Sequence, residues 1–203
     1  MASEEMEFPL QQLQKQIDFL VELDKLKSIH RRTKPVGSER YENSAEHSWQ
    51  LAIMAMVLAD YANQPIDVTR VIQMVLVHDI VEIDADDTFV YDLAARQNKA
   101  AIEQAAAVRI FGILQEAQRD RLMGLWEEYE ARETPEAQFA YALDRFMPLL
   151  QNYHNRGGSW QENGITQQQV ESVCATIGDG ATELWNFAKA LIDDAVAQGY
   201  LQK

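Results

Sequence analysis

The chain has 203 residues, of which 47% are hydrophobic, and a formal net charge of −14. This length suits one domain with a single core, and the negative charge argues against a nucleic-acid polymer as partner, because such binding depends on many lysine and arginine contacts to phosphate. The single cysteine, Cys174, excludes an internal disulfide and a multi-cysteine metal site, and it fits a reducing cytosol.

Helical periodicity predicts every element in chain order, and no segment alternates as a strand would. The segment ENSAEHSW marks one helix start, because Asn43 and Glu46 have capping-box spacing, and Thr166 with Gln169 marks another. Thr134 and Pro135 suit the N-cap and first position of a long helix. We therefore predict an all-α fold with helices near residues 10–28, 43–61, 66–83, 96–112, 116–132, 135–154, 166–176 and 181–197.

Two connections stand out between these helices. Residues 25–40, KLKSIHRRTKPVGSER, hold six of the 18 basic residues, so this loop either attracts a phosphate or is an ordinary solvated loop. The glycine-rich stretch NRGGSW is predicted to be a loop. The longest apolar run, LAIMAMVLA, is too short to span a bilayer, and no secretion signal opens the chain, so we expect a soluble, cytoplasmic protein without a membrane partner.

Histidine and aspartate side chains fall on the apolar faces of three predicted helices. His47 shares its face with Leu51 and Leu58, Asp79 lies on the stripe of Ile72 and Val75 with His78 one step around, and Asp144 follows Ala137, Ala140 and Tyr141. A lone inward histidine is usually a hydrogen-bonded core residue, and a lone inward aspartate usually caps a helix or pairs with an arginine.

Together, His47, His78, Asp79 and Asp144 present two imidazoles and two carboxylates to one interior, and a divalent cation would satisfy all four. We therefore predict one divalent metal ion. The even mixture of nitrogen and oxygen ligands leaves manganese, cobalt, iron, nickel, zinc and magnesium open.

The order of these residues, H…HD…D, resembles the signature of the HD-domain metal-dependent phosphohydrolases. The segments ENSAEHSW, VHDIVEIDADDT and ALDRFMPLL resemble its 5′-deoxynucleotidase branch. The likeness covers about residues 10–155 and leaves a C-terminal helical extension, about residues 160–203, without an assigned motif. It implies a single HD domain over residues 1–203, a helical bundle around one metal, the four residues above as ligands, and a homodimer.

The resemblance also implies roles for further residues. Glu82 occupies the acid position of HDxxE and would orient or deprotonate a bound water, although by itself it could be an exposed acid at a helix end. Asp87, which matches the aspartate at the start of the family's substrate loop, would act in catalysis and, with Thr88 and Asp79, in contacts to substrate. In the 5′-deoxynucleotidases an arginine fifteen positions before the first metal-binding histidine helps to bind phosphate, and this position is Arg32 here. The neighbouring residue is Thr33, where those enzymes carry a tryptophan, and Arg31 is an equal candidate.

These features predict a phosphomonoesterase that releases phosphate from a small anionic ester, a (deoxy)nucleoside 5′-monophosphate. One alternative is a hydrolase of guanosine polyphosphate or another nucleotide pyrophosphate, because HDIVEID is also similar to the pattern of those enzymes. Another is a non-catalytic sensor that binds a metal or a nucleotide.

Overall fold

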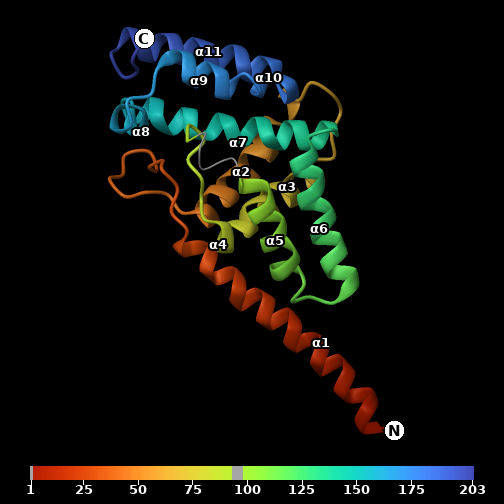
Figure 1. Cartoon of the computed structure of the whole chain (residues 1–203). Coiled ribbons are helices and arrows are strands. Elements are labelled where there is room, and N and C mark those ends of the chain that lie inside the picture. Colours follow the sequence, from red (N-terminus) through yellow and green to blue (C-terminus); the bar gives the residue numbers. More distant parts are fainter. Residues whose placement is uncertain (1, 93–97) are drawn as a thin grey trace.

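The computed structural model describes residues 2–92 and 98–203, with side chains from residue 10 onward (Figure 1). The described residues contain helices and turns but no strand, which confirms the all-α prediction. The elements are α1 (Ala2–Leu23), η1 (Asp24–Ser28), α2 (Ser44–Leu58), η2 (Ala59–Tyr61), α3 (Val68–Val77), η3 (His78–Val81), α4 (Glu82–Ala85), α5 (Lys99–Phe111), α6 (Glu116–Ala131), α7 (Pro135–His154), α8 (Gly158–Glu162), α9 (Gln167–Cys174), α10 (Ile177–Gly180) and α11 (Thr182–Ala197).

The helix starts follow the predicted caps. The Asn43 and Thr166 side chains each take part in a complete capping box, and Thr134 Oγ1 accepts from the Ala137 amide with Pro135 in the first turn. Such caps satisfy backbone N–H groups that have no partner inside the helix. The predicted helix start near residue 96 lies outside the described residues.

Helix α7 crosses the middle of the molecule. In Figure 1 the bundle of α2, α3, α5 and α6 lies on one side of it and the C-terminal helices α9, α10 and α11 lie on the other, while α1 extends away from the body. Side chains from both sides join one buried hydrophobic cluster, for example Leu51, Met74, Leu143, Ile177 and Ile192. None of the helices in the described part of the chain is long and apolar enough to cross a membrane.

Two sequence predictions need correction. The helix expected over 66–83 is three pieces, because the chain tightens to a 3₁₀ turn at His78 between α3 and α4, and such a turn within a helical stretch often marks a functional position. The stretch NRGGSW, predicted as a loop, contains the start of α8. Gly157 has a φ of 104°, which glycine adopts without strain, and Asn152 Oδ1 accepts from the amide and hydroxyl of Ser159 at the start of this helix.

Candidate active site

Three of the predicted metal ligands converge in the protein interior. Nitrogen and carboxylate atoms of His47 from α2, His78 from η3 and Asp144 from α7 lie within 4.8 Å of one another, and all three residues are buried. His47 Nε2 is 2.8 Å from Asp144 Oδ1, and His78 Nε2 is 3.9 Å from the same oxygen. The stripes of three helices therefore meet at one point, as the sequence predicted.

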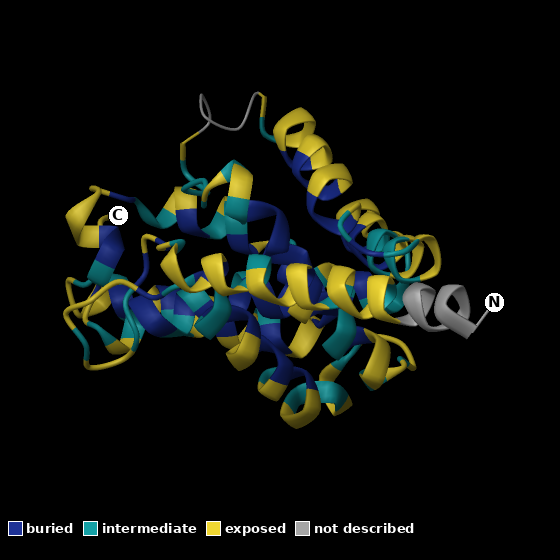
Figure 2. Ribbon diagram, turned by 90° about the horizontal axis from the view of Figure 1, so that it is seen from below, coloured by how far each residue is buried: buried dark blue, intermediate teal, exposed yellow. Residues whose placement is uncertain are grey.

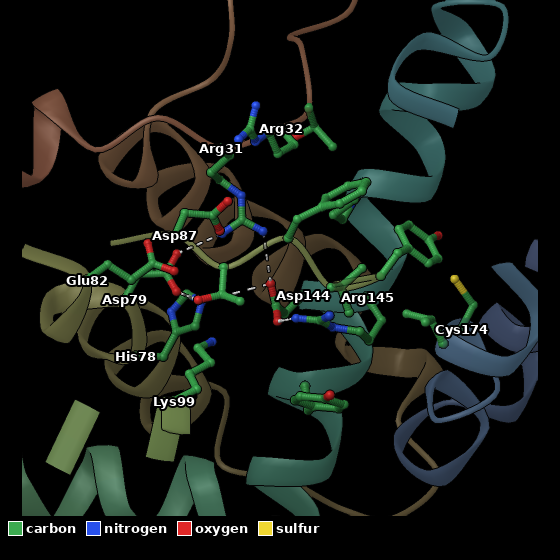
Figure 3. Close-up of a pocket in the computed structure, with 18 of the residues that line it drawn as sticks. Arg31, Arg32, His78, Asp79, Glu82, Asp87, Lys99, Asp144, Arg145 and Cys174 are labelled. Carbon is green, nitrogen blue, oxygen red and sulfur yellow. Dashed lines mark hydrogen bonds and ion pairs between the residues drawn. The ribbon is translucent and has the colours of Figure 1, made fainter. Parts of the chain in front are cut away.

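Asp79, the fourth predicted ligand, lies beside this cluster. Its Oδ1 is 3.0 Å from His78 Nε2, and its Oδ2 accepts a hydrogen bond of 3.1 Å from Arg31 (Figure 3). Burial raises the pKa of Asp79, but the protonated form of His78 and the charge of Arg31 outweigh burial and hold that pKa below its usual value. The Asp79 carboxylate is thus an anionic acceptor at the edge of the cluster.

The hydrogen bonds of His78 leave a nitrogen suited to a cation. Its Nδ1 lies 2.9 Å from the Val75 carbonyl oxygen, which can only accept, so Nδ1 carries the proton in the neutral ring. Nε2 then presents its lone pair, and it has no hydrogen-bond partner although it is buried beside two carboxylate oxygens. A cation among these acceptors would remove their mutual repulsion, so the donor set fits a divalent metal.

Glu42 supports His47 from behind and was not singled out by the sequence. Its Oε2 lies 3.5 Å from His47 Nδ1, while its Oε1 accepts a hydrogen bond of 2.7 Å from Gln151. Burial and the charge of Arg31 lower the pKa of His47, but the carboxylates of Asp144 and Glu42 outweigh both and raise it overall. A carboxylate behind the imidazole, as in many metal sites, would orient the ring with Nε2 toward the cluster.

Asp144 is held by two residues that the sequence did not indicate. Its Oδ2 accepts a hydrogen bond of 3.0 Å from the Tyr129 hydroxyl and a second from the guanidinium of Arg145. Burial raises the pKa of Asp144, but the charge of Arg145 and the His47 hydrogen bond hold it well below its usual value. With Oδ2 occupied by donors, Oδ1 is the oxygen that faces His47 and His78.

Glu82 lies inside the site rather than at an exposed helix end. It is 3% exposed, and its Oε2 accepts a hydrogen bond of 2.7 Å from Ser44 Oγ at the start of α2. Burial, followed by the charge of Asp79, raises the pKa of Glu82 well above its usual value. A carboxyl group with a raised pKa accepts protons more readily near neutral pH, which suits the role that the resemblance implied.

The two candidate phosphate-binding arginines point to different environments. The chain around them is extended and pairs with the segment before α2: the Arg31 amide donates to Glu42 O, and the Glu42 amide donates to Thr33 O, both at 2.9 Å. Because alternate residues of an extended chain face opposite sides, Arg31 and Thr33 are buried and Arg32 is exposed. Figure 3 shows the Arg31 guanidinium above the cluster and Arg32 directed away from it.

Arg31 is shared by four carboxylates. Besides Asp79, it approaches Glu42 at 3.7 Å, Asp87 at 3.7 Å and Asp144 at 3.8 Å. Burial disfavours its charge, but the charges of Asp79, Asp87 and Asp144 more than compensate and raise the pKa of Arg31. Asp87 is half-buried, with a pKa raised by burial against the opposing effect of Arg31, and Thr88 follows it along the same cavity wall.

Comparison with known proteins agrees with this arrangement. Residues 23–185 match the HD domain family. This chain belongs to the HD-domain family. It is 34% identical to the human 5′-deoxynucleotidase HDDC2 over 113 residues. It is 31% identical to the 5′-deoxynucleotidase HDDC2 of Dictyostelium discoideum over 144 residues, which are 68% of this chain and 75% of the Dictyostelium protein. The chain spans about half the length of the human relative, 54%.

Solved structures show the same HD-domain fold. A predicted metal-dependent phosphohydrolase from Magnetospirillum magnetotacticum MS-1 is 48% identical, with a TM-score of 0.92 over 97% of this chain and 98% of that chain. A conserved hypothetical protein from Pyrococcus furiosus, at 19% identity and a TM-score of 0.62, shares the fold. The predicted family and fold are therefore confirmed.

The HD-domain site opens into a cavity of about 280 Å³. The sequence-predicted residues His78, Asp79, Glu82, Asp87 and Asp144 line it, together with Thr88 and both arginines of the basic loop. Other lining residues come from elements that carried no motif: Lys99 and Glu103 of α5, Tyr129 and Glu130 of α6, and Trp160 and Cys174 of the C-terminal extension. The extension thus contributes directly to the cavity wall.

Proposed function

We propose that this HD-domain protein is a metal-dependent phosphomonoesterase that releases phosphate from (deoxy)nucleoside 5′-monophosphates. The observation that carries the proposal is the buried set of His47, His78 and Asp144, flanked by Arg31 and Glu82. His78 and Asp144 of this set line the cavity, and His47 lies behind them, fully buried. The name 5′-deoxynucleotidase of the similar proteins supports the substrate class.

Four side chains would hold one divalent ion: His47, His78, Asp79 and Asp144. The fit rests on the unpartnered His78 Nε2 and the carboxylate oxygens of Asp79 and Asp144 around it. When bound, such an ion acidifies a coordinated water and neutralises charge on phosphoryl oxygens. Manganese, cobalt, iron, nickel, zinc and magnesium all suit two nitrogen and two oxygen ligands.

The remaining residues would bind the substrate and move the proton. Arg31 would donate hydrogen bonds to the phosphoryl oxygens, since its guanidinium has five N–H donors and already lies over the cluster. The carboxylate of Glu82, positioned by Ser44, would accept a proton from the attacking water. Asp87 and Thr88 on the cavity wall would contact the sugar of the leaving alcohol. Arg32, exposed at the cavity edge, is the weaker candidate for phosphate.

The cavity size favours a mononucleotide. Pockets for small ligands usually measure about 300–1,000 Å³, so a cavity of about 280 Å³ lies just below this range. It suits one nucleoside monophosphate better than a polymer or a larger polyphosphate.

We also propose a cytoplasmic homodimer. Leu10, Leu13, Ile17 and Leu20 recur at intervals of three and four along α1, and each is at least 45% exposed. In Figure 2 most of the described part of α1, next to the N-terminus, has the colour of exposed residues. Such a stripe suits the same stripe of a second copy. Sedimentation of Ile17→Glu, beside Lys15→Glu as control, tests this: a monomer formed only by Ile17→Glu supports the dimer, and a wild-type monomer contradicts it. The single cysteine, free and buried, supports a reducing compartment.

The experiment that tests the activity is phosphate release from a panel of ribo- and deoxynucleoside 5′-monophosphates. Chelator-stripped protein receives manganese, cobalt or magnesium one at a time. Asp79→Ala is compared with Asp84→Ala, which removes an exposed acid of the neighbouring α4. We expect release that requires the metal and is lost only in Asp79→Ala.

The same experiment separates the alternatives. No phosphate with any metal would refute the proposal. Pyrophosphate released from a guanosine 3′-pyrophosphate would instead indicate the polyphosphate hydrolase, and tight nucleotide binding without turnover would indicate a sensor.

A further inference from the structure

The cavity continues from the proposed metal site, at His78, Asp79 and Asp144, along α7. Tyr141, Asp144, Pro148, Leu149 and Asn152 of this helix all line it. At a rise of about 1.5 Å per residue, the eight residues from Asp144 to Asn152 correspond to about 12 Å. One end of the cavity is therefore well separated from the site where the phosphate would bind.

This far end, which we call the aromatic end, is formed by Phe89, Tyr91, Trp160, Val173 and Cys174. Phe89 and Tyr91 follow α4 and pack edge to face, with ring centroids 5.2 Å apart. Trp160 of α8 is 2% exposed, and Val173 and Cys174 are the last residues of α9. The C-terminal extension thus closes the cavity.

The start of α8 is fixed to α7 near this end. Asn152 Oδ1 accepts hydrogen bonds from the Ser159 amide at 2.8 Å and the Ser159 hydroxyl at 2.9 Å. Both residues are buried and line the cavity. Trp160, the next residue, is therefore held in a rigid wall.

The charge distribution distinguishes the aromatic end from the opposite side. Among the described residues that line the aromatic end, none is acidic, and Arg145 is the neighbouring charged group, lying between Asp144 and Cys174 in Figure 3. Burial raises the pKa of Cys174 to about 12, so its thiol is neutral. The side near α5 and α6 is instead lined by Lys99, Glu103, Glu130 and Arg132. A planar uncharged group suits the first environment and not the second.

We propose that the aromatic end binds the nucleobase of the substrate, with its ring among the side chains of Phe89, Tyr91 and Trp160. The inference rests on the proposed function, because it places the phosphate at the metal cluster and the base at the other end of one cavity. Base stacking on protein aromatic groups typically strengthens binding about tenfold to a hundredfold. The aromatic end would therefore make the enzyme prefer nucleotides to sugar phosphates without a base.

The test compares two substrates in two tryptophan variants of α9. Val173→Trp fills the aromatic end, whereas Ser172→Trp places the same side chain at the exposed neighbouring position, which does not line the cavity. The kcat/KM of manganese-loaded protein is measured for deoxynucleoside 5′-monophosphates and for 2-deoxyribose 5-phosphate. Circular dichroism checks folding, and Val173→Phe is the smaller second variant.

We expect wild type and Ser172→Trp to prefer the nucleotide at least tenfold. Val173→Trp should lose at least tenfold in kcat/KM for the nucleotide while its value for the sugar phosphate stays within about twofold. Equal kcat/KM for both substrates in wild type, or an equal loss for both in Val173→Trp, would overturn the inference and leave the proposed function standing.

A failure of the proposed function gives a different result, because wild type would then release phosphate from neither substrate. The aromatic end is in that case tested by calorimetric titration with free nucleosides, which carry the base but no phosphate. Binding by wild type and Ser172→Trp that is lost in Val173→Trp supports a base site, and no binding or equal binding by all three overturns it.

Discussion

Replacing Tyr129 by phenylalanine removes one hydroxyl beside the buried set of His47, His78 and Asp144 and keeps the ring. The hydroxyl donates to Asp144 Oδ2 at 3.0 Å, and the ring lies against His78 with centroids 4.8 Å apart. Arg145 still donates to Oδ2 in the variant, so the carboxylate remains paired. The substitution therefore tests whether the hydroxyl helps direct Oδ1 toward His47 and His78.

The magnitude follows from the charge of the acceptor. A hydrogen bond to an ionised group contributes about 1.5–3 kcal/mol. If this free energy serves to orient Asp144, its loss weakens metal binding about tenfold to a hundredfold, which is also the usual effect of removing a residue that supports a metal ligand.

Calorimetric titration of manganese into chelator-stripped protein measures this effect. Tyr153→Phe is the matched control, because it removes a hydroxyl that donates to Asp194 at 2.6 Å outside the cluster. Thermal unfolding of both variants reports the general cost of the lost hydroxyl. A Tyr129→Phe protein that binds manganese within twofold of Tyr153→Phe would show that Tyr129 does not orient Asp144.

Three further predictions concern catalysis, phosphate binding and stability. Glu82→Gln keeps the contact with Ser44, but its amide cannot take a proton, so kcat should fall at least about a hundredfold while the manganese affinity stays the same. A kcat equal to that of wild type would show that Glu82 does not act in the mechanism. Arg31→Lys replaces a guanidinium, which can donate two parallel hydrogen bonds to a phosphate, and should raise KM at least about tenfold, whereas the KM of Arg32→Lys should stay within twofold of wild type. A larger rise of KM in Arg32→Lys than in Arg31→Lys would contradict the proposal that Arg31 binds the phosphate. Burial raises the pKa of the Cys174 thiol to about 12, whereas the thiol of the unfolded chain loses its proton above about pH 8.5, so rising pH favours the unfolded state. Between pH 7 and pH 10 the free energy of unfolding should therefore fall by about 2 kcal/mol more in wild type than in Cys174→Ala. Equal losses in urea unfolding would argue against a buried thiol.

The sequence was most informative where helices carry the site. His47, His78 and Asp144 lie on helical stripes of apolar residues, and because such a stripe must face the core, three polar residues on three stripes were expected to meet. The helix caps were likewise predictable, since a cap depends on neighbouring residues only.

The residues that were missed depend on contacts distant in sequence. Glu42 precedes α2 in a segment without helical periodicity, and its burial results from pairing with Arg31 and Thr33. The different burial of Arg31 and Arg32 depends on the same pairing, because the extended chain directs one side chain inward and its neighbour outward. The capping box at Asn43 could have indicated that Glu42, the residue before it, lies outside the helix. It could not have indicated that Glu42 contacts His47.

The arrangement around Arg31 explains why binding of the cation and of the phosphate should depend on each other. Arg31 is one positive charge shared by four acids, Glu42, Asp79, Asp87 and Asp144, with Glu82 also nearby. A phosphate entering this site alone would therefore meet more negative than positive charge. A divalent ion among His47, His78, Asp79 and Asp144 would neutralise the carboxylates that now compete for the guanidinium, which is then free to donate to phosphoryl oxygens. Each ligand would strengthen the binding of the other, because coupling of this kind is reciprocal. The acidic cluster would thus suit an anionic substrate only together with its cation, and this would account for the proposed phosphate site in a chain whose net charge is −14.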